Sequence, residues 1–153
     1  MTIQRLKLLI EDADDLAVAA TVLQDAIVPA ADIAYLPEDR RFVFVANRFC
    51  WEGAPEDKAR APFERVNCGV TFDGIRAVRS REIDPGGTGM LSLLTVGVET
   101  DAIMLVFAGG GAIRLEVDTI RGHMEDIGEP WPTQSRPRHV DAGASEGNLS
   151  DLD

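Results

Sequence analysis

The sequence has few thiol and imidazole side chains, which are the usual ligands of zinc and serve as catalytic groups in many enzymes. Its 153 residues include only two cysteines and two histidines. Two cysteines are too few for a disulfide scaffold, and none of these four residues has the spacing of a zinc site. We therefore expect no metal, no cofactor and reduced thiols, with Cys50 and Cys68 packed in the core as small apolar side chains.

Basic residues and long apolar runs are also scarce. The sequence has 15 Lys and Arg against 26 Asp and Glu, which gives a net charge of −11. This balance argues against binding to nucleic acid or to an anionic membrane surface. No apolar run approaches the ~20 residues that span a bilayer, and the first residues lack the ~7–15-residue apolar core of a signal peptide. We expect a cytoplasmic protein.

The composition is that of an ordinary folded domain, with 45% hydrophobic and 27% charged residues. Residues 1–132 are predicted to form a single globular domain. Residues 133–153 are predicted to be an extended to disordered acidic tail, because they contain little that is apolar and end in a run without a basic residue.

Most of the chain shows the patterns of β-strands, either alternating or continuously apolar. The predicted strands are residues 3–10, 32–36, 40–51, 63–83, 90–98, 102–108 and 112–117. The segment 63–83 fits either one bent strand or a hairpin that turns at Asp73 and Gly74. The run from Gly109 to Gly111 fits a hairpin turn better than an anion-binding loop, since it opens no helix.

Two segments are predicted to be helices. The first begins at an acidic cluster, residues 11–15, where Asp12 caps the first turn, and it continues to Val28 before Pro29. We interpret this cluster as a helix start rather than as a cation site, because it lacks the spacing and the glycine of a calcium loop. The second helix begins at residue 118 or 119, shows an apolar stripe at residues 120, 124 and 127, and ends at Gly128.

These elements predict an α+β fold. It would be a mostly antiparallel seven- to eight-stranded barrel or sandwich, with one helix after the first strand and a C-terminal capping helix. This element order resembles pleckstrin-homology-like folds, especially the phosphotyrosine-binding variant. The resemblance is one of topology, and a shared fold does not imply a shared function.

Several short stretches resemble a small bacterial family of unknown function that is often encoded near histidinol dehydrogenase. They are residues 33–37, 41–42, 47–52, 77–81, 91–94, 107–115 and 131–139. The resemblance covers residues 6–139 and implies a single cytoplasmic domain. It supplies no catalytic residue, and we predict none.

Arginines are the one group that points to a ligand. Arg76, Arg79 and Arg81 lie on one predicted strand, and Arg48 lies on a predicted strand nearby. Such a patch would bind phosphate or carboxylate through bidentate contacts. Alternatively, the arginines would pair with Asp and Glu across strands on a solvent-facing surface.

We expect a non-enzymatic binding or protein-interaction module. Its partner would be a peptide added as a strand beside the C-terminal helix, or a second copy joined through an edge strand. The alternative is a small-anion binding protein, or an enzyme, that uses the arginine patch. An enzyme would also need an acid or base such as His123 or Glu52 beside the arginines.

Overall fold

The structure is a computed structural model, and it describes residues 5–50 and 63–133. This part of the chain forms ten β-strands, one α-helix and one short 3-10 helix. The helices are α1 (Ala13–Val22) and η1 (Ala30–Asp32). The strands are β1 (Lys7–Ile10), β2 (Ile27–Pro29), β3 (Ala34–Leu36), β4 (Arg41–Phe49), β5 (Phe63–Asp73), β6 (Ile75–Arg81), β7 (Met90–Glu99), β8 (Ala102–Phe107), β9 (Ala112–Val117) and β10 (Gly122–Thr133).

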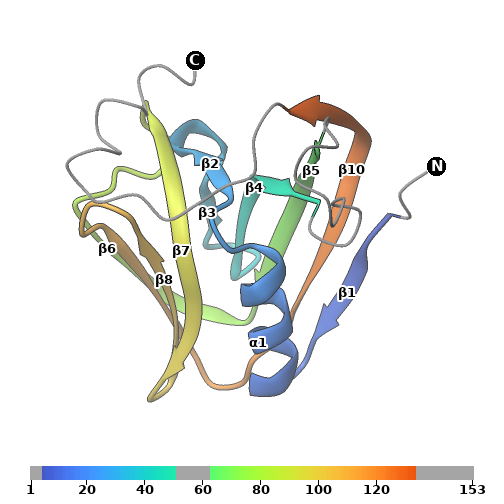
Figure 1. Cartoon of the computed structure of the whole chain (residues 1–153). Helices are drawn as coiled ribbons and strands as arrows, with labels where there is room; N and C mark the ends of the chain where they lie inside the picture. The colour runs from blue at the N-terminus through green and yellow to red at the C-terminus, as the bar shows by residue number, and fades with distance from the viewer. Residues whose placement is uncertain (1–4, 51–62, 134–153) are drawn as a thin grey trace.

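All ten strands belong to one curved antiparallel sheet (Figure 1). The strand order is β1-β10-β5-β4-β2-β7-β8-β9-β6, and β3 pairs with β4 beside this path. The sheet therefore has two ends, β1 and β6. Helix α1 contacts both β7 and β1 and lies between them in Figure 1. No helix in the described ranges is long and apolar enough to cross a membrane.

This arrangement corrects the predicted fold class. The antiparallel sheet and the helix after the first strand are as expected, but the sheet has ten strands and is not closed. The only α-helix in residues 5–50 and 63–133 is α1, so the predicted C-terminal capping helix is absent there. The expected pleckstrin-homology-like barrel depended on that helix and was wrong.

Strand β10 occupies the place of the predicted second helix. Its buried residues alternate along the chain: Gly122, Met124 and Asp126 face inward. The inward position at 126 is an aspartate, so the apolar alternation of a strand is interrupted, and residues 120, 124 and 127 mimic a helical stripe. Gly122 is required by the close packing of strands, since a Cβ there would collide with the Thr71 carbonyl oxygen and the Phe72 ring.

The first helix begins as predicted but ends earlier. The backbone N–H of Asp15 donates to the Asp12 carboxylate at 2.8 Å, which caps the first turn. The helix ends at Val22 rather than near Val28. Asp25 adopts a positive φ of 62°, and its N–H donates to the Leu93 carbonyl, so the chain turns into β2.

The segment from β5 to β6 is one bent strand and not a hairpin. β5 pairs with β4 and β10, whereas β6 pairs with β9, so the two halves do not pair with each other. The bend is at Gly74, whose φ is 72°. Gly109 and Gly110 also have positive φ values, and they connect β8 to β9, which confirms the predicted hairpin turn.

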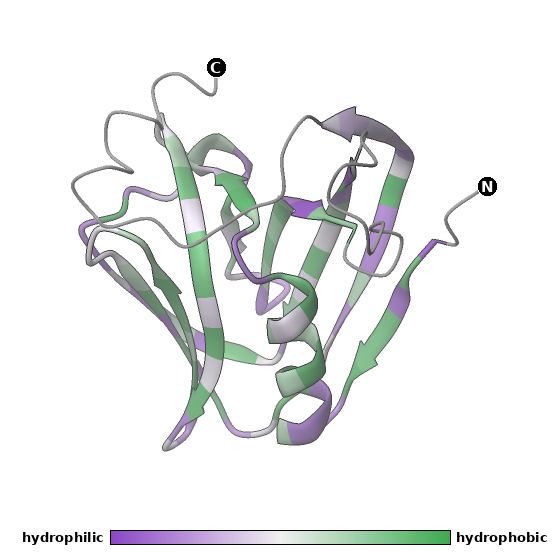
Figure 2. Cartoon of the chain, viewed as in Figure 1, coloured by the Kyte–Doolittle hydropathy of each residue, from purple (hydrophilic) through white to green (hydrophobic). Residues whose placement is uncertain are grey.

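The core lies on the concave side of the sheet, where the alternating apolar positions of the strands meet α1 (Figure 2). Leu16, Ala19 and Leu23 supply the helix side of this core. Cys50 and Cys68 are both buried and are not joined in a disulfide, which confirms their predicted packing role. In β4 the buried series Phe42, Phe44 and Ala46 continues with Arg48, so a charged side chain also enters the interior.

Candidate functional site

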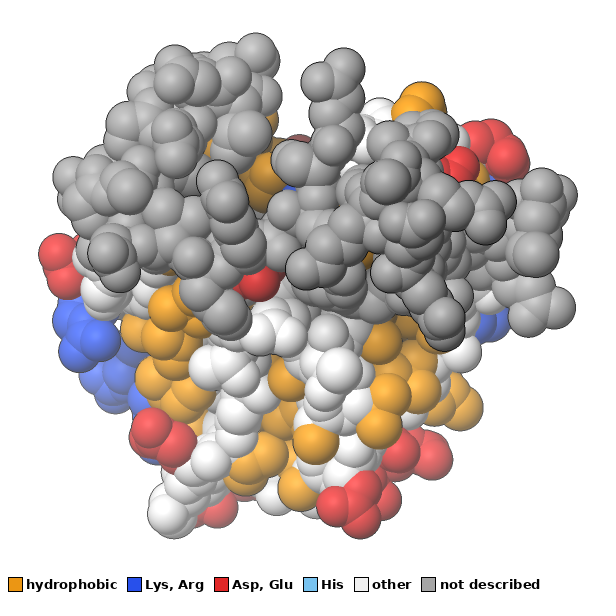
Figure 3. Space-filling view, in the orientation of Figure 1, with side chains coloured by type: hydrophobic (Ala, Val, Ile, Leu, Met, Phe, Trp, Pro, Cys, Tyr) orange, Lys and Arg blue, Asp and Glu red, His pale blue; other side chains and the backbone are white. Residues whose placement is uncertain are grey.

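Three of the predicted arginines lie on β6, the last strand of the sheet, which is followed inward by β9 and then β8. Arg79 pairs with Arg114 of β9, and Arg114 pairs with Met104 of β8. Arg81 pairs with Ala112. Since side chains alternate along a strand, these residues share the outer face while Ile113 and its inward neighbours fill the core. Figure 3 shows basic side chains at the left margin, on the side where Figure 1 places β6 and β8.

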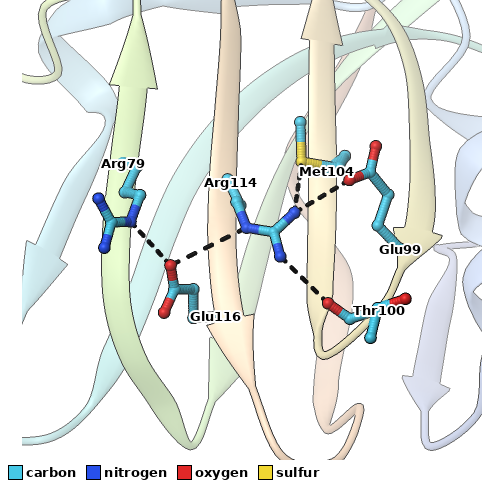
Figure 4. A network of polar contacts seen from close by, with 6 residues as sticks. All are labelled: Arg79, Glu99, Thr100, Met104, Arg114 and Glu116. Carbon is cyan, nitrogen blue, oxygen red and sulfur yellow. Dashed lines mark hydrogen bonds and ion pairs between the residues drawn. The ribbon is translucent and has the colours of Figure 1, made fainter.

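Carboxylates on the same face pair with two of these arginines (Figure 4). Arg79 Nε donates to Glu116 Oε2 at 2.8 Å, and Arg114 Nη1 donates to Glu99 Oε1 at 2.9 Å. Glu116 Oε2 also lies 3.9 Å from Arg114 Nε. The hydrogen bond from Arg79 holds the pKa of Glu116 below its ordinary value. The cross-strand pairing considered as the alternative from sequence is therefore present for Arg79, and Arg114, which was not among the predicted arginines, forms such a pair too.

Arg81 differs from its neighbours. Its side chain makes one hydrogen bond, from Nη2 to the Gly110 carbonyl oxygen at 3.4 Å, and within the described residues no carboxylate lies at ion-pair distance. A shallow depression of about 190 Å³ lies beside it. The depression is lined by Arg79, Ser80, Arg81, Met104, Ala112 and Arg114. Its lining thus combines three arginines with the apolar residues Met104 and Ala112.

Arg76 lies at the start of the same strand but outside this depression. Its Nε is 3.3 Å from Asp118 Oδ1, and both side chains are substantially exposed. The β6–β9 register shifts between Ile75 and Ala77, and this irregularity separates Arg76 from the regular alternation of Arg79 and Arg81. Arg76 therefore adds positive charge along the strand without lining the depression.

The structure does not bring Arg48 together with the other predicted ligand-binding arginines. Arg48 is fully buried, and its Nε and Nη2 donate to the two carboxylate oxygens of Asp126 at 2.9 and 2.8 Å. Asp126 Oδ2 also accepts the backbone N–H of Leu6 at 2.7 Å. This bidentate pair links β4, β10 and the residue that precedes β1, so we assign it to the interior of the fold rather than to the surface patch.

Burial also lowers the reactivity of the Cys68 thiol, which lies beside the Arg48–Asp126 pair. Cys68 pairs with Ala46 on one side and with Asp126 on the other. Burial, followed by the negative charge of Asp126, raises the pKa of Cys68 to about 12. The thiol is therefore protonated at neutral pH and is a poor nucleophile.

The acid or base that an enzyme would need is not among the residues that line the depression. His123 lies on β10, opposite Leu9 and Thr71. Glu52 lies outside the described residues, and so does the predicted tail at residues 133–153, apart from Thr133 at the end of β10. Among residues 5–50 and 63–133, no three His, Cys, Asp or Glu side chains gather as a metal site would require.

Sequence reasoning missed Arg114, although the signal was available. Residues 112–117 alternate, and this alternation places Arg114 and Glu116 together on one face. What the sequence lacks is the strand order, because only the pairing of β9 with β6 puts Arg114 opposite Arg79. The three arginines of the depression are therefore brought together by the strand order, which the sequence alone does not reveal.

Comparison with known proteins gives a family without an assigned activity. A family model described as "Protein of unknown function (DUF2948)" matches residues 6–139. No curated protein and no solved structure matches the chain.

Proposed function

The chain belongs to the DUF2948 family of unknown function, and from that premise we propose that it is a non-enzymatic binding module for an anionic partner. The anionic group would lie in the depression between Arg79, Arg81 and Arg114. The observation that carries the proposal is Arg81, which lines this depression and has no carboxylate at ion-pair distance in the described part of the chain.

The chemistry of the lining supports an oxyanion ligand. A guanidinium group offers planar, paired N–H donors that match a carboxylate or a phosphate, and it stays charged at any physiological pH. Glu116 and Glu99 already hold Arg79 and Arg114 in place, which reduces the entropy lost when a ligand binds. Met104 and Ala112 supply apolar contact beside the charges.

Binding is favoured over catalysis because of what surrounds the arginines. The charged side chains that line the depression are Arg79, Arg81 and Arg114, and two of them pair with Glu116 and Glu99. Neither His123 nor Cys68 lies there. We place this binding in the cytoplasm, which is favoured by two cysteines, Cys50 and Cys68, that are not joined in a disulfide.

The test is ligand-induced stabilisation at constant ionic strength, with inorganic phosphate and glutarate as probes. Wild-type protein, Arg81→Gln and Arg121→Gln are compared by thermal unfolding. Arg121 is an exposed arginine that does not line the depression, so its replacement removes the same charge elsewhere. A ligand at 100 times its Kd adds about 2.7 kcal/mol to the free energy of unfolding.

We expect at least one probe to stabilise the wild type and Arg121→Gln, and to stabilise Arg81→Gln much less. Equal stabilisation of all three proteins would mean that the anion binds elsewhere. No stabilisation of the wild type by either probe would contradict the proposed anion site.

A further inference from the structure

The strand that carries Arg79 and Arg81 is an edge of the sheet. β6 pairs with β9 on one side, and it ends the strand order. On the other side, the bonds to described residues are made by its first residue: the Ile75 N–H donates to the Arg40 carbonyl, and the Tyr35 hydroxyl donates to the Ile75 carbonyl. Beyond Ile75, within the described residues, β6 makes no backbone hydrogen bond on this side. Residues 79–81 are exposed. An edge of this kind is able to pair with another extended chain.

We infer that the anionic partner is an extended acidic polypeptide segment that adds to β6 as a further strand. This inference rests on the proposed anion-binding function and names the partner class. Backbone pairing would come from β6, while carboxylates of the added strand would lie beside Arg79 and Arg81. This mode of recognition combines main-chain hydrogen bonds with side-chain specificity at alternate positions.

The shape of the depression favours a chain over a free small molecule. Its volume of about 190 Å³ is smaller than the ~300–1,000 Å³ of typical small-molecule pockets. It is also bounded by β6 itself, through Arg79, Ser80 and Arg81. A ligand anchored along the edge strand would need only to place a carboxylate there.

The alternation of β6 specifies the sequence that fits. Arg79 and Arg81 face outward, and Val78 packs against the core. Residues directly opposite on neighbouring strands have Cβ atoms about 4.5–5.5 Å apart. The added strand should therefore carry Asp or Glu opposite Arg79 and Arg81, a small residue opposite Ser80, and an apolar residue opposite Val78.

Charge argues against a second copy of this chain as the occupant. Two β6 strands paired across a two-fold axis would bring arginines of one copy next to arginines of the other, and like charges on paired strands are destabilising. An acidic segment would instead place carboxylates next to these arginines, and opposite charges on paired strands are stabilising. Because the net charge of the protein is −11, the surface elsewhere tends to repel such a segment, and the basic edge determines where it binds.

The experiment uses the full chain and a capped peptide of seven residues, the length of β6, with the sequence Thr-Val-Glu-Thr-Glu-Val-Thr. A second peptide has both glutamates replaced by lysine. Two further peptides keep the glutamates but carry N-methyl groups on either the odd-numbered or the even-numbered backbone amides. Binding is measured by isothermal titration calorimetry for the wild type, Arg79→Gln/Arg81→Gln and Arg121→Gln.

We expect the glutamate peptide to bind and the lysine peptide not to bind. Loss of each arginine contact should weaken binding about threefold, so the double variant should bind about tenfold more weakly, while Arg121→Gln binds like the wild type. One N-methylated peptide should lose binding and the other keep it, because alternate amides of an added strand face β6.

The outcomes separate the strand inference from the anion site. Equal binding of both N-methylated peptides would overturn strand addition while leaving the anion site intact. Phosphate or glutarate binding without any peptide binding would do the same. A concentration-dependent dimer of the wild type that the glutamate peptide displaces would identify a second copy as the occupant of the β6 edge and overturn the inference.

Discussion

Replacing Asp126 by Asn should destabilise the protein strongly, because it removes the negative charge that pairs with the buried Arg48 guanidinium. The Arg48 and Asp126 side chains are 0% and 2% exposed, and two hydrogen bonds of 2.9 and 2.8 Å join them. Removing one partner of such a pair costs about 3–5 kcal/mol. Asn preserves the size of the side chain and an acceptor oxygen for the Leu6 N–H, so the loss reports mainly on charge.

A double-mutant cycle in urea measures this effect. Arg48→Met should also destabilise, whereas Arg48→Met/Asp126→Asn removes both charges and should lose about 2 kcal/mol less than the sum of the single losses. Arg41→Met is the matched control on the same strand, because its pair with Asp73 is solvent-exposed and its loss should barely move the unfolding midpoint. A loss below about 1 kcal/mol for Asp126→Asn, additive with Arg48→Met, would refute the reasoning.

Two further predictions concern packing and pH. Gly122→Ala should cost about 1–3 kcal/mol in urea unfolding, because the new Cβ meets the Thr71 carbonyl, whereas Gly97→Ala meets nothing within 4 Å and should be nearly neutral; equal losses would contradict the assigned crowding. Burial raises the pKa of Cys68 from 9.0 to about 12. The unfolded state therefore loses this proton first, and the free energy of unfolding should fall by about 1.4 kcal/mol per pH unit between pH 9 and pH 12. Cys68→Ala should lack this component, and identical slopes for the two proteins would show that Cys68 does not titrate as assigned.

The sequence was sufficient to predict those features that depend on interactions between residues close together in the chain. The Asp12 cap and the glycines between β8 and β9 have conformations that depend on neighbouring residues, and both are predictable from sequence. The bend at Gly74 was one of two alternatives, and the choice depended on which strands pair with β5 and β6. Pairing over long sequence separations is not encoded in a local pattern.

The C-terminal strand was missed because a buried charge interrupts its pattern. Asp126 faces inward only because Arg48, 78 positions earlier, neutralises it there. Without knowledge of that pair, an aspartate indicates a solvent-facing position, and the remaining apolar residues of this segment fit a helix. The same pair explains Arg48: it continues the inward alternation of β4, so its burial is predictable only together with Asp126.

The arginine patch was partly predictable. The spacing of Arg79 and Arg81 places them on one face of a strand, and this holds in the structure. The addition of Arg114, and the position of β6 at the edge, both follow from strand order. The sequence thus indicates anion binding by arginines, while the strand order determines which arginines lie together and at which edge of the sheet.

The most direct test of the binding account is an NMR titration of the ¹⁵N-labelled full chain with the capped glutamate peptide. We predict that amide shifts concentrate on residues 76–81 of β6 and on the adjacent residues 112–116 of β9, and that the β6 amides gain protection from hydrogen exchange. Shifts confined to β1 or to the outer face of β10, with β6 unchanged, would contradict the claim that β6 and its arginines form the binding surface.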